Sequence, residues 1–377
     1  KVNNYEANWY SQQLSEKYRE VPFGNEPADI FIINSCTVTN TAGSKTRQMM
    51  HRARKQNENA VLCVVGCYVQ MEADDEDIFR DVDILVGSSH KKEIPELIDR
   101  FLQNHEKISI VEDLKGCPFE EMKLNSFSQT RAYLKIQDGC NQFCSYCIIP
   151  YARGRVRSRD IHNVLEEVKR LAKNGFKEVV LTGIHLSSYG IDCDDHLLHL
   201  IQEVHKVEGI ERIRLGSLEP RLITEAFVQE IAKLPKLCPH FHLSLQSGCD
   251  ETLKRMNRKY DTKEYEAGCE ILRKYFEHPA ITTDVIVGFP GETEEEFLST
   301  KEFLSRIHFY EMHIFKYSIR QGTRAADMPD QVPEEVKTAR SAQLMELSEK
   351  MSLEFREHYL DSEQEVLFEE LCQVDGE

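Results

Sequence analysis

Short apolar runs rich in β-branched residues alternate with amphipathic helical segments along most of the 377-residue chain. Continuous apolar runs of this length are typical of strands that are buried on both faces of a parallel sheet. Strands that alternate with helices predict an α/β fold. The chain is long enough for two or three domains, and we expect two successive α/β blocks.

The first block, residues 1–115, is expected to be a doubly wound parallel sheet domain. The segment that follows, 116–128, lacks periodicity and is interpreted as a linker. The predicted strands of the block are 29–35, 61–66, 83–87 and 108–111, and the predicted helices lie near 5–18, 42–56, 70–80 and 93–103.

The second block, residues 129–332, repeats a strand–helix unit six times. Six parallel strands with right-handed helical crossovers curl into a partial (α/β)6 barrel. Each strand ends in polar or small residues, and the C-terminal ends of barrel strands are where function gathers. The predicted strands are 132–138, 178–183, 212–217, 240–246, 282–288 and 311–318.

The C-terminal part of the chain has a different pattern. Residues 333–361 form one charged amphipathic segment, which predicts a helix packed on the outside of the barrel. Residues 362–377 resemble one strand of a further β-rich domain, of which the chain contains only the start.

Composition excludes some classes of protein. No run approaches 18 apolar residues, which excludes a membrane-spanning helix, and no signal peptide is recognisable at Lys1. Twelve cysteines in so long a chain favour reduced thiols over a disulfide scaffold, so we expect a cytoplasmic protein. The net charge of −17 argues against a generally basic surface but allows a local basic track for nucleic acid.

Three cysteines with the spacing C-x3-C-x2-C, Cys140, Cys144 and Cys147, follow the first barrel strand. Structural zinc sites use four protein ligands, and iron–sulfur cubes that only carry electrons use four thiolates. Three thiols in one loop leave one metal position for a substrate or cofactor. The alternative is a zinc site with three cysteines that a distant histidine completes.

With Tyr146 directly before its last cysteine, this motif resembles that of the radical S-adenosylmethionine (SAM) enzymes. The resemblance implies that the three cysteines hold a 4Fe–4S cluster whose fourth iron is chelated by SAM. An electron from the cluster then cleaves SAM and releases a 5′-deoxyadenosyl radical. The barrel is accordingly expected to be a radical SAM barrel, in which the protein positions the cofactors and excludes water.

Three longer strings resemble the methylthiotransferases, which place a methylthio group on a tRNA base or a ribosomal protein. They are INSCTVTN (33–40), VVGCYVQ (64–70) and GCNQFCSYCIIPYARGRVRSR (139–159). Within that family, KVNNYE at the N-terminus and IIPYARGRVRSR are most similar to the branch that modifies N6-threonylcarbamoyladenosine beside the tRNA anticodon. The resemblance also implies that 362–377 begins a TRAM RNA-binding domain. The alternatives are a methylthiotransferase for N6-isopentenyladenosine and a non-catalytic, zinc-containing tRNA-binding protein.

The same resemblance implies a second, auxiliary 4Fe–4S cluster with three cysteines in the first block. Cys36 and Cys67 match two of them, and both end neighbouring predicted strands. The family's third cysteine lies directly before the segment that begins at Lys1, so it either precedes this sequence or is replaced by a thiol such as Cys63. Because Cys63 lies in the middle of a predicted strand, a buried core thiol is the simpler interpretation.

Several residues at strand ends are expected to bind SAM together with Tyr146. They are Gly183, Glu219, Ser244 and Gln246. Four arginines alternate after the cysteine motif, so an extended segment would direct them to one side, toward the phosphates of a tRNA anticodon loop or the cofactor. They are Arg153, Arg155, Arg157 and Arg159, and the alternative is a solvated basic loop.

The resemblance implies the remaining partners. The radical attacks C2 of the modified adenine, sulfur comes from the auxiliary cluster region, and a second SAM supplies the methyl group. A flavodoxin or ferredoxin is expected as the electron donor.

Overall fold

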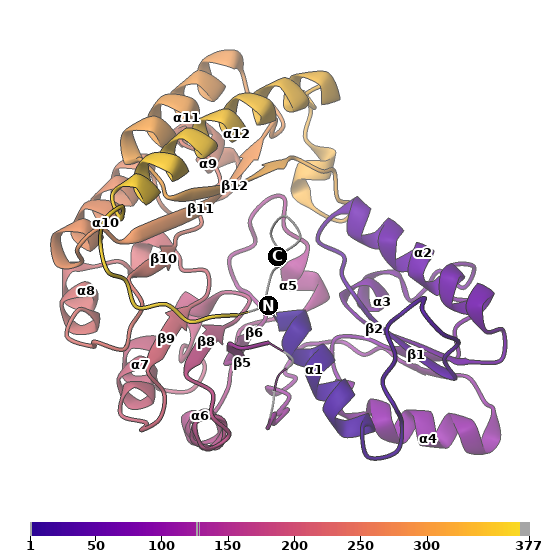
Figure 1. Ribbon diagram of the computed structural model, residues 1–377. Helices are drawn as coiled ribbons and strands as arrows, with labels where there is room; N and C mark the ends of the chain where they lie inside the picture. Colours follow the sequence, from indigo (N-terminus) through magenta and orange to yellow (C-terminus); the bar gives the residue numbers. More distant parts are fainter. Residues whose placement is uncertain (1, 126, 128, 370–377) are drawn as a thin grey trace, which may run out of the picture.

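Two α/β units make up the protein, one at each side of Figure 1. The structure is a computed structural model that describes residues 2–125, 127 and 129–369. Every strand of the main sheets pairs in parallel with its neighbours, which confirms the predicted α/β class. In the part of the chain that the structure describes, no helix is long and apolar enough to cross a membrane.

The N-terminal unit is a four-stranded sheet with the order β1-β2-β3-β4. Apolar side chains of α1 and α4 pack on one face of the sheet and those of α2 and α3 on the other, so helices cover both faces as expected. Its elements are α1 (Val2–Leu14), β1 (Ile30–Ser35), α2 (Asn40–Gln56), β2 (Val61–Gly66), α3 (Cys67–Glu72), β3 (Ile84–Val86), η1 (Lys91–Glu93), α4 (Ile94–Asn104) and β4 (Ile108–Ile110).

One helix prediction in this unit is wrong. The helix expected at 70–80 is the short α3, which begins at Cys67 and ends at Glu72. Four consecutive acidic residues follow at 74–77. Adjacent carboxylates repel one another and aspartate is a poor helix former, so the chain continues in turns.

The second unit is an open barrel of two three-stranded parallel sheets, β5-β8-β9 and β10-β11-β12. The parallel bridges Ile213–Leu237 and Leu218–Leu243 connect them. Its strands are β5 (Ala132–Lys135), β8 (Glu178–Thr182), β9 (Arg212–Leu215), β10 (His240–His242), β11 (Ala280–Val287) and β12 (Glu311–Lys316), with the antiparallel pair β6 (Gln137–Asp138) and β7 (Arg157–Ser158) beside them. Its helices are α5 (Ile149–Ala152), α6 (Ile161–Lys173), η2 (Leu186–Ser188), α7 (Leu197–His205), η3 (Pro220–Leu222), α8 (Glu225–Ile231), α9 (Asp250–Arg255), α10 (Thr262–Tyr275), α11 (Glu294–Ile307), η4 (Arg324–Asp327) and α12 (Glu334–Glu357).

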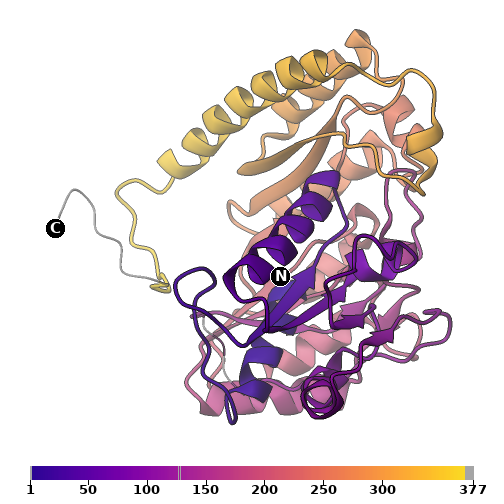
Figure 2. The same cartoon turned by 90° about the vertical axis from the view of Figure 1, so that its right-hand side faces the viewer.

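The long helix α12 lies against β12 on the outside of the barrel, and Figure 2 shows it in yellow along one edge of the molecule. It buries Leu344 and Met351 in the barrel's apolar cluster. Of the segment expected to begin a further domain, residues 362–369 form no strand, and residues 370–377 lie outside the described residues.

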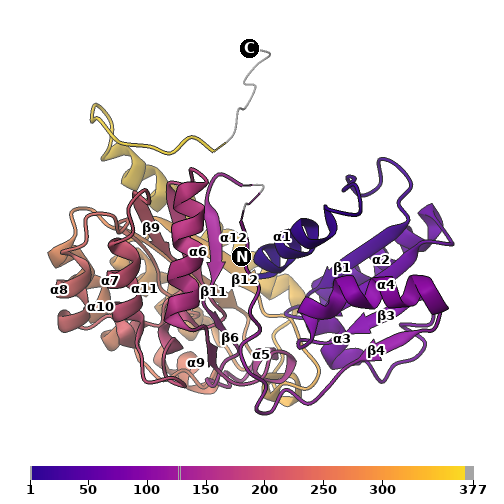
Figure 3. The same cartoon turned by 90° about the horizontal axis from the view of Figure 1, so that it is seen from below.

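Helix α1 and the irregular segment 111–125 join the two units, and Figure 3 shows α1 between them. Met122 and Leu124 are buried in the apolar cluster of the N-terminal unit, while the backbone N–H of Leu124 donates to Glu167 of α6. The Tyr5 hydroxyl of α1 donates to the carbonyl of Met122. These contacts pack the predicted linker between the units.

Candidate active site

The three cysteines of the C-x3-C-x2-C motif lie in one loop after β6, at the end of the first barrel strand. Cys140 and Cys144 are buried and Cys147 is half-buried. Gly139 starts the loop with a φ of +70°, and a Cβ added there would lie 1.8 Å from the carbonyl oxygen of Arg155. The loop therefore turns tightly against the segment that follows α5, and only glycine fits at this point.

A turn after α9 supports this loop from the opposite side of the barrel. The backbone N–H of Ser145 donates to the carbonyl of Met256 at 3.0 Å. The Asn257 amide donates to the carbonyl of Phe143 at 2.9 Å. Both contacts hold the backbone between the cysteines in one conformation.

Arg258, in the same turn, contacts the motif although its position in the sequence did not predict this. Its Nη1 donates to the Sγ of Cys144 at 3.0 Å, and its guanidinium lies over the Tyr260 ring at 4.8 Å. Burial opposes its charge, but the neighbouring Tyr260, Tyr146 and Cys144 keep the pKa of Arg258 well above its ordinary value. The positive charge therefore persists beside the thiols, and no sequence spacing links Arg258 to them.

The thiols fit an iron–sulfur cube better than a single zinc ion. Zinc–sulfur bonds of about 2.3 Å in a tetrahedron place sulfurs within about 4 Å of one another. Among the described residues, the three cysteines do not form a group whose ligand atoms all lie within 4.8 Å. Burial raises the pKa of Cys140 to about 11 and that of Cys147 to about 12, so these two thiols need a bound cation to ionise.

Two of the residues predicted to bind SAM contact the loop or belong to it. Tyr146 packs edge-on against Phe289, with their ring centroids 6.4 Å apart. Glu219 accepts a hydrogen bond from the Gln142 amide at 3.2 Å and pairs with His185 at 3.3 Å. Burial raises the pKa of Glu219, but His185 and the charge of Arg258 together more than offset this effect, and the pKa lies below its ordinary value.

The other three residues predicted to bind SAM are Gly183, Ser244 and Gln246, which lie just beyond the ends of β8 and β10. The carbonyl of Ser244 accepts a hydrogen bond from the Tyr260 hydroxyl at 2.5 Å. Gln246 has a φ of +75°, a costly conformation for a non-glycine residue. A Cβ at Gly183 would lie 2.7 Å from Oε1 of Gln137, so this glycine makes room for a side chain of the protein.

The expectation that four arginines reach RNA together is wrong for three of them. Arg153, Arg157 and Arg159 are all buried. The chain is not extended here, because α5 ends at Ala152 and Gly154 adopts a left-handed turn. Only Arg155 is exposed, and its guanidinium lies over the ring of Phe143 at 4.5 Å.

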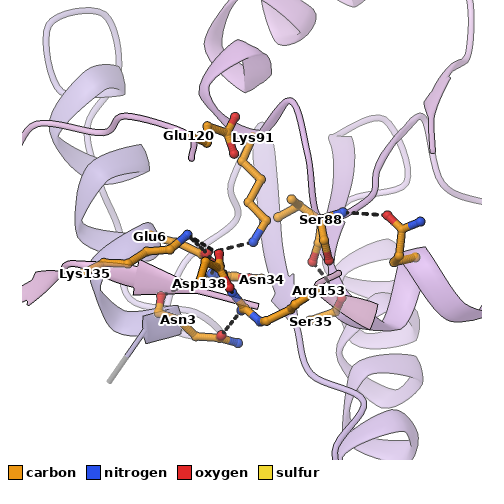
Figure 4. A network of polar contacts seen from close by, with 12 residues as sticks. Asn3, Glu6, Asn34, Ser35, Ser88, Lys91, Glu120, Lys135, Asp138 and Arg153 are labelled. Carbon is orange, nitrogen blue, oxygen red and sulfur yellow. Dashed lines mark hydrogen bonds and ion pairs between the residues drawn. The ribbon is translucent and has the colours of Figure 1, made fainter. Parts of the chain in front are cut away.

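The buried arginines belong to ion networks that join the two units. Figure 4 shows Lys91, Lys135 and Arg153 around Glu6 and Asp138. Glu6 Oε1 lies 2.7 Å from Lys91 Nζ and 3.1 Å from Lys135 Nζ, while Arg153 lies 3.1 Å from Asp138. In a second network, Arg159 pairs with Glu167 at 2.6 Å and with Glu121 at 2.9 Å.

The structure brings Cys36 and Cys67 to the same edge of the N-terminal sheet. They follow β1 and β2, whose last residues Ser35 and Gly66 are register partners. Cys63 is fully buried in the apolar cluster beneath α1 and α4, three residues or about 10 Å before the end of β2. Burial raises its pKa to about 12, as is typical of a core thiol.

Comparison with known proteins agrees with this arrangement. Residues 134–304 match the model of the radical SAM superfamily, and residues 1–87 match that of Uncharacterized protein family UPF0004. The chain is 41% identical over 374 residues to threonylcarbamoyladenosine tRNA methylthiotransferase MtaB of Bacillus subtilis, covering 98% of this chain and 83% of that protein. It belongs to the tRNA methylthiotransferase family of radical SAM enzymes.

Other relatives and structures widen the comparison. The MtaB of Aquifex aeolicus is 39% identical over 95% of this chain and 88% of its own. A tRNA-2-methylthio-N(6)-dimethylallyladenosine synthase of Pelotomaculum thermopropionicum is 40% identical over 92% of this chain and 79% of its own. The radical SAM methyltransferase TsrM of Kitasatospora setae shares the fold, with a TM-score of 0.62 at 14% identity over 85% of this chain and 74% of that one. Like other radical SAM enzymes, this methylthiotransferase uses a 4Fe–4S cluster and SAM, and it acts on tRNA.

Proposed function

We propose that this enzyme catalyses the radical methylthiolation of C2 in N6-threonylcarbamoyladenosine, beside the anticodon of tRNA. The observation that carries the proposal is the buried cysteine loop at the mouth of the barrel, with Arg258 hydrogen-bonded to Cys144. Relatives named for this nucleoside are 41% and 39% identical to the chain. The 40% identity to a dimethylallyladenosine synthase keeps that nucleoside as the second candidate.

In this proposal Cys140, Cys144 and Cys147 hold the cluster that binds SAM. When bound, the cluster supplies the electron that cleaves SAM to methionine and a deoxyadenosyl radical. The protein holds the loop rigid through the turn after α9, and buried Ile148 limits the access of water. Tyr146, Gly183, Glu219, Ser244 and Gln246 surround the cofactor in this assignment.

The auxiliary cluster and the source of sulfur belong to the N-terminal unit. Cys36 and Cys67 are two proposed ligands, and the third stays open between a residue before Lys1 and another thiol. Helix α3, which begins at Cys67, packs against α5, which begins two residues after Cys147. This packing supports transfer of sulfur between two neighbouring sites, with the methyl group from a second SAM.

Each part of the chain has its place in this assignment. Residues 1–115 carry the auxiliary site, 116–128 connect it to the radical SAM barrel at 129–332, 333–361 pack on the barrel, and 362–377 begin an RNA-binding TRAM domain. A flavodoxin or ferredoxin supplies the electrons. Because its substrate is tRNA, the enzyme acts in the cytoplasm in this proposal. An anticodon loop favours this reaction because its unpaired bases leave their stack at low cost.

Replacement of one proposed ligand tests the reaction. The variant Cys144→Ala should release no deoxyadenosine from SAM, whereas Cys117→Ala, outside the motif, should release it at the wild-type rate. Continued release by Cys144→Ala with its iron in place would refute the assignment. Mass spectrometry of tRNA nucleosides from a deletion strain then decides the substrate by which methylthio nucleoside disappears.

A further inference from the structure

Three potential metal ligands converge on the inner face of the barrel, outside the cysteine loop. His242, Asp284 and His313 come from the adjacent strands β10, β11 and β12. Their ligand atoms all lie within 4.8 Å of one another, and no other group of three or more His, Cys, Asp or Glu in the described part of the chain meets this limit.

The alternation of side chains along the strands shows which face these residues occupy. Phe241, Val285 and Met312 belong to the apolar cluster between the strands and the outer helices. Their sequence neighbours His242, Asp284 and His313 therefore point to the opposite, inner face. This face is open at β12, where the His313 side chain is 50% exposed.

Local contacts orient each of the three groups. Nδ1 of His242 lies 2.9 Å from the Thr282 hydroxyl, and its Nε2 lies 3.2 Å from a carboxylate oxygen of Asp284. Asp284 and His313 are register partners on β11 and β12, and the rings of the two histidines stack with centroids 5.7 Å apart. A hydrogen bond to the second ring nitrogen is how proteins usually fix a metal-binding histidine.

We propose that His242, Asp284 and His313 bind a divalent transition-metal ion. Two imidazoles and one carboxylate form a donor set for zinc or iron(II) that leaves further coordination positions to other ligands. These positions lie on the inner face of the open barrel, where the His313 side chain is half-exposed. The metal is separate from the clusters of the cysteine sites, since it is held by nitrogen and oxygen.

The site lies on the same strand face as a residue that packs beside the cysteine loop. Ile286 lies two residues after Asp284 on the same face of β11 and packs in a small cluster with Tyr146 and Phe289. Two residues of a strand span about 7 Å. Asp284 therefore lies about 7 Å along β11 from the residue that packs beside the cysteine loop. An oxygen or nitrogen atom of a molecule bound inside the barrel can complete the coordination of the metal.

Zinc binding to the full chain with reconstituted clusters tests the proposal. After gel filtration, His313→Ala and Asp284→Asn should each hold one zinc per chain fewer than the wild type. His199→Ala is the matched control, because His199 also pairs with a carboxylate, Asp195 at 2.8 Å, but on the exposed surface. Equal zinc content in all four proteins overturns the proposal.

Cobalt(II) distinguishes this site from the cysteines. The wild type should show weak visible d–d bands of nitrogen and oxygen ligands that His313→Ala lacks. Iron content and melting temperature that match the wild type establish that the variant is folded and loaded. Cobalt bands that are the same in both proteins, or that show only thiolate charge transfer, contradict a metal at His313.

Discussion

The guanidinium of Arg258 donates a hydrogen bond to the sulfur of Cys144, with 3.0 Å between Nη1 and Sγ. The contact joins the turn after α9 to the loop after β6, which are 114 residues apart in the sequence. A buried positive charge at this distance stabilises negative charge on the sulfur. Outer hydrogen-bond partners of this kind orient the ligands of metal sites and tune the metal.

Replacement of Arg258 by methionine should therefore slow deoxyadenosine release by about 10- to 100-fold, the usual effect of losing an outer hydrogen-bond partner. Iron content should change little, because the three thiols remain. Release of deoxyadenosine from SAM under a fixed reductant measures the effect. The exposed Arg221→Met is the matched control and should keep the wild-type rate. An unchanged rate in Arg258→Met would show that the hydrogen bond has no role in the reaction.

Gly139→Ala should prevent the cysteine loop from closing, because the new Cβ would lie 1.8 Å from the carbonyl oxygen of Arg155. Iron bound after reconstitution should fall to a small fraction of the wild-type value. Gly116→Ala isolates the strain of a left-handed backbone, since Gly116 has a φ of +76° with no atom within 4 Å of the added Cβ. This control should cost about 1 kcal/mol and keep the iron. Similar iron in both variants contradicts the prediction.

Glu6→Gln should destabilise the protein by about 3–5 kcal/mol at pH 7, because buried cations lose their partner. Urea unfolding measures the difference, and the exposed Glu16→Gln serves as control with little change. A loss as small as that of the control would show that the network of Figure 4 contributes little.

The same carboxylate predicts a pH dependence. Burial alone raises the pKa of Glu6, but Lys91, Arg153 and Lys135 more than offset this and hold the pKa far below its usual range. Its contribution to stability is therefore complete above the unfolded-state pKa of about 4.3 and is lost as the pH falls below it. Between pH 5 and pH 3 the wild type should lose more stability than Glu6→Gln. Parallel curves for the two proteins contradict the prediction.

Arg155→Gln should weaken tRNA binding, because Arg155 is the exposed arginine of the four that follow the cysteine motif. Loss of one phosphate contact lowers the slope of log affinity against log salt by about one. Binding titrations at several salt concentrations measure this slope. The exposed Arg356→Gln, at the end of α12, is the control and should leave it unchanged. Identical slopes for Arg155→Gln and the wild type exclude a phosphate contact.

Local patterns in the sequence were sufficient to predict the parallel strands of both units. The clearest case is β2, an apolar run in which every residue is buried, whereas β12 alternates apolar and polar residues and exposes several of them. The cysteine motif was equally readable, since its three thiols are neighbours along the chain. The short α3 was mispredicted because repulsion among the acidic residues at 74–77 competes with helical periodicity.

Tertiary structure alone decided what surrounds those cysteines. Alternating arginines suggested one exposed row, but burial against Glu6, Asp138 and Glu167 made Arg153 and Arg159 parts of the joint between the units. A charged side chain is buried only where an oppositely charged partner pairs with it, and here those partners lie on other helices and strands. The Arg258 contact with Cys144 has the same origin, because barrel closure joins strand ends that are remote in the chain.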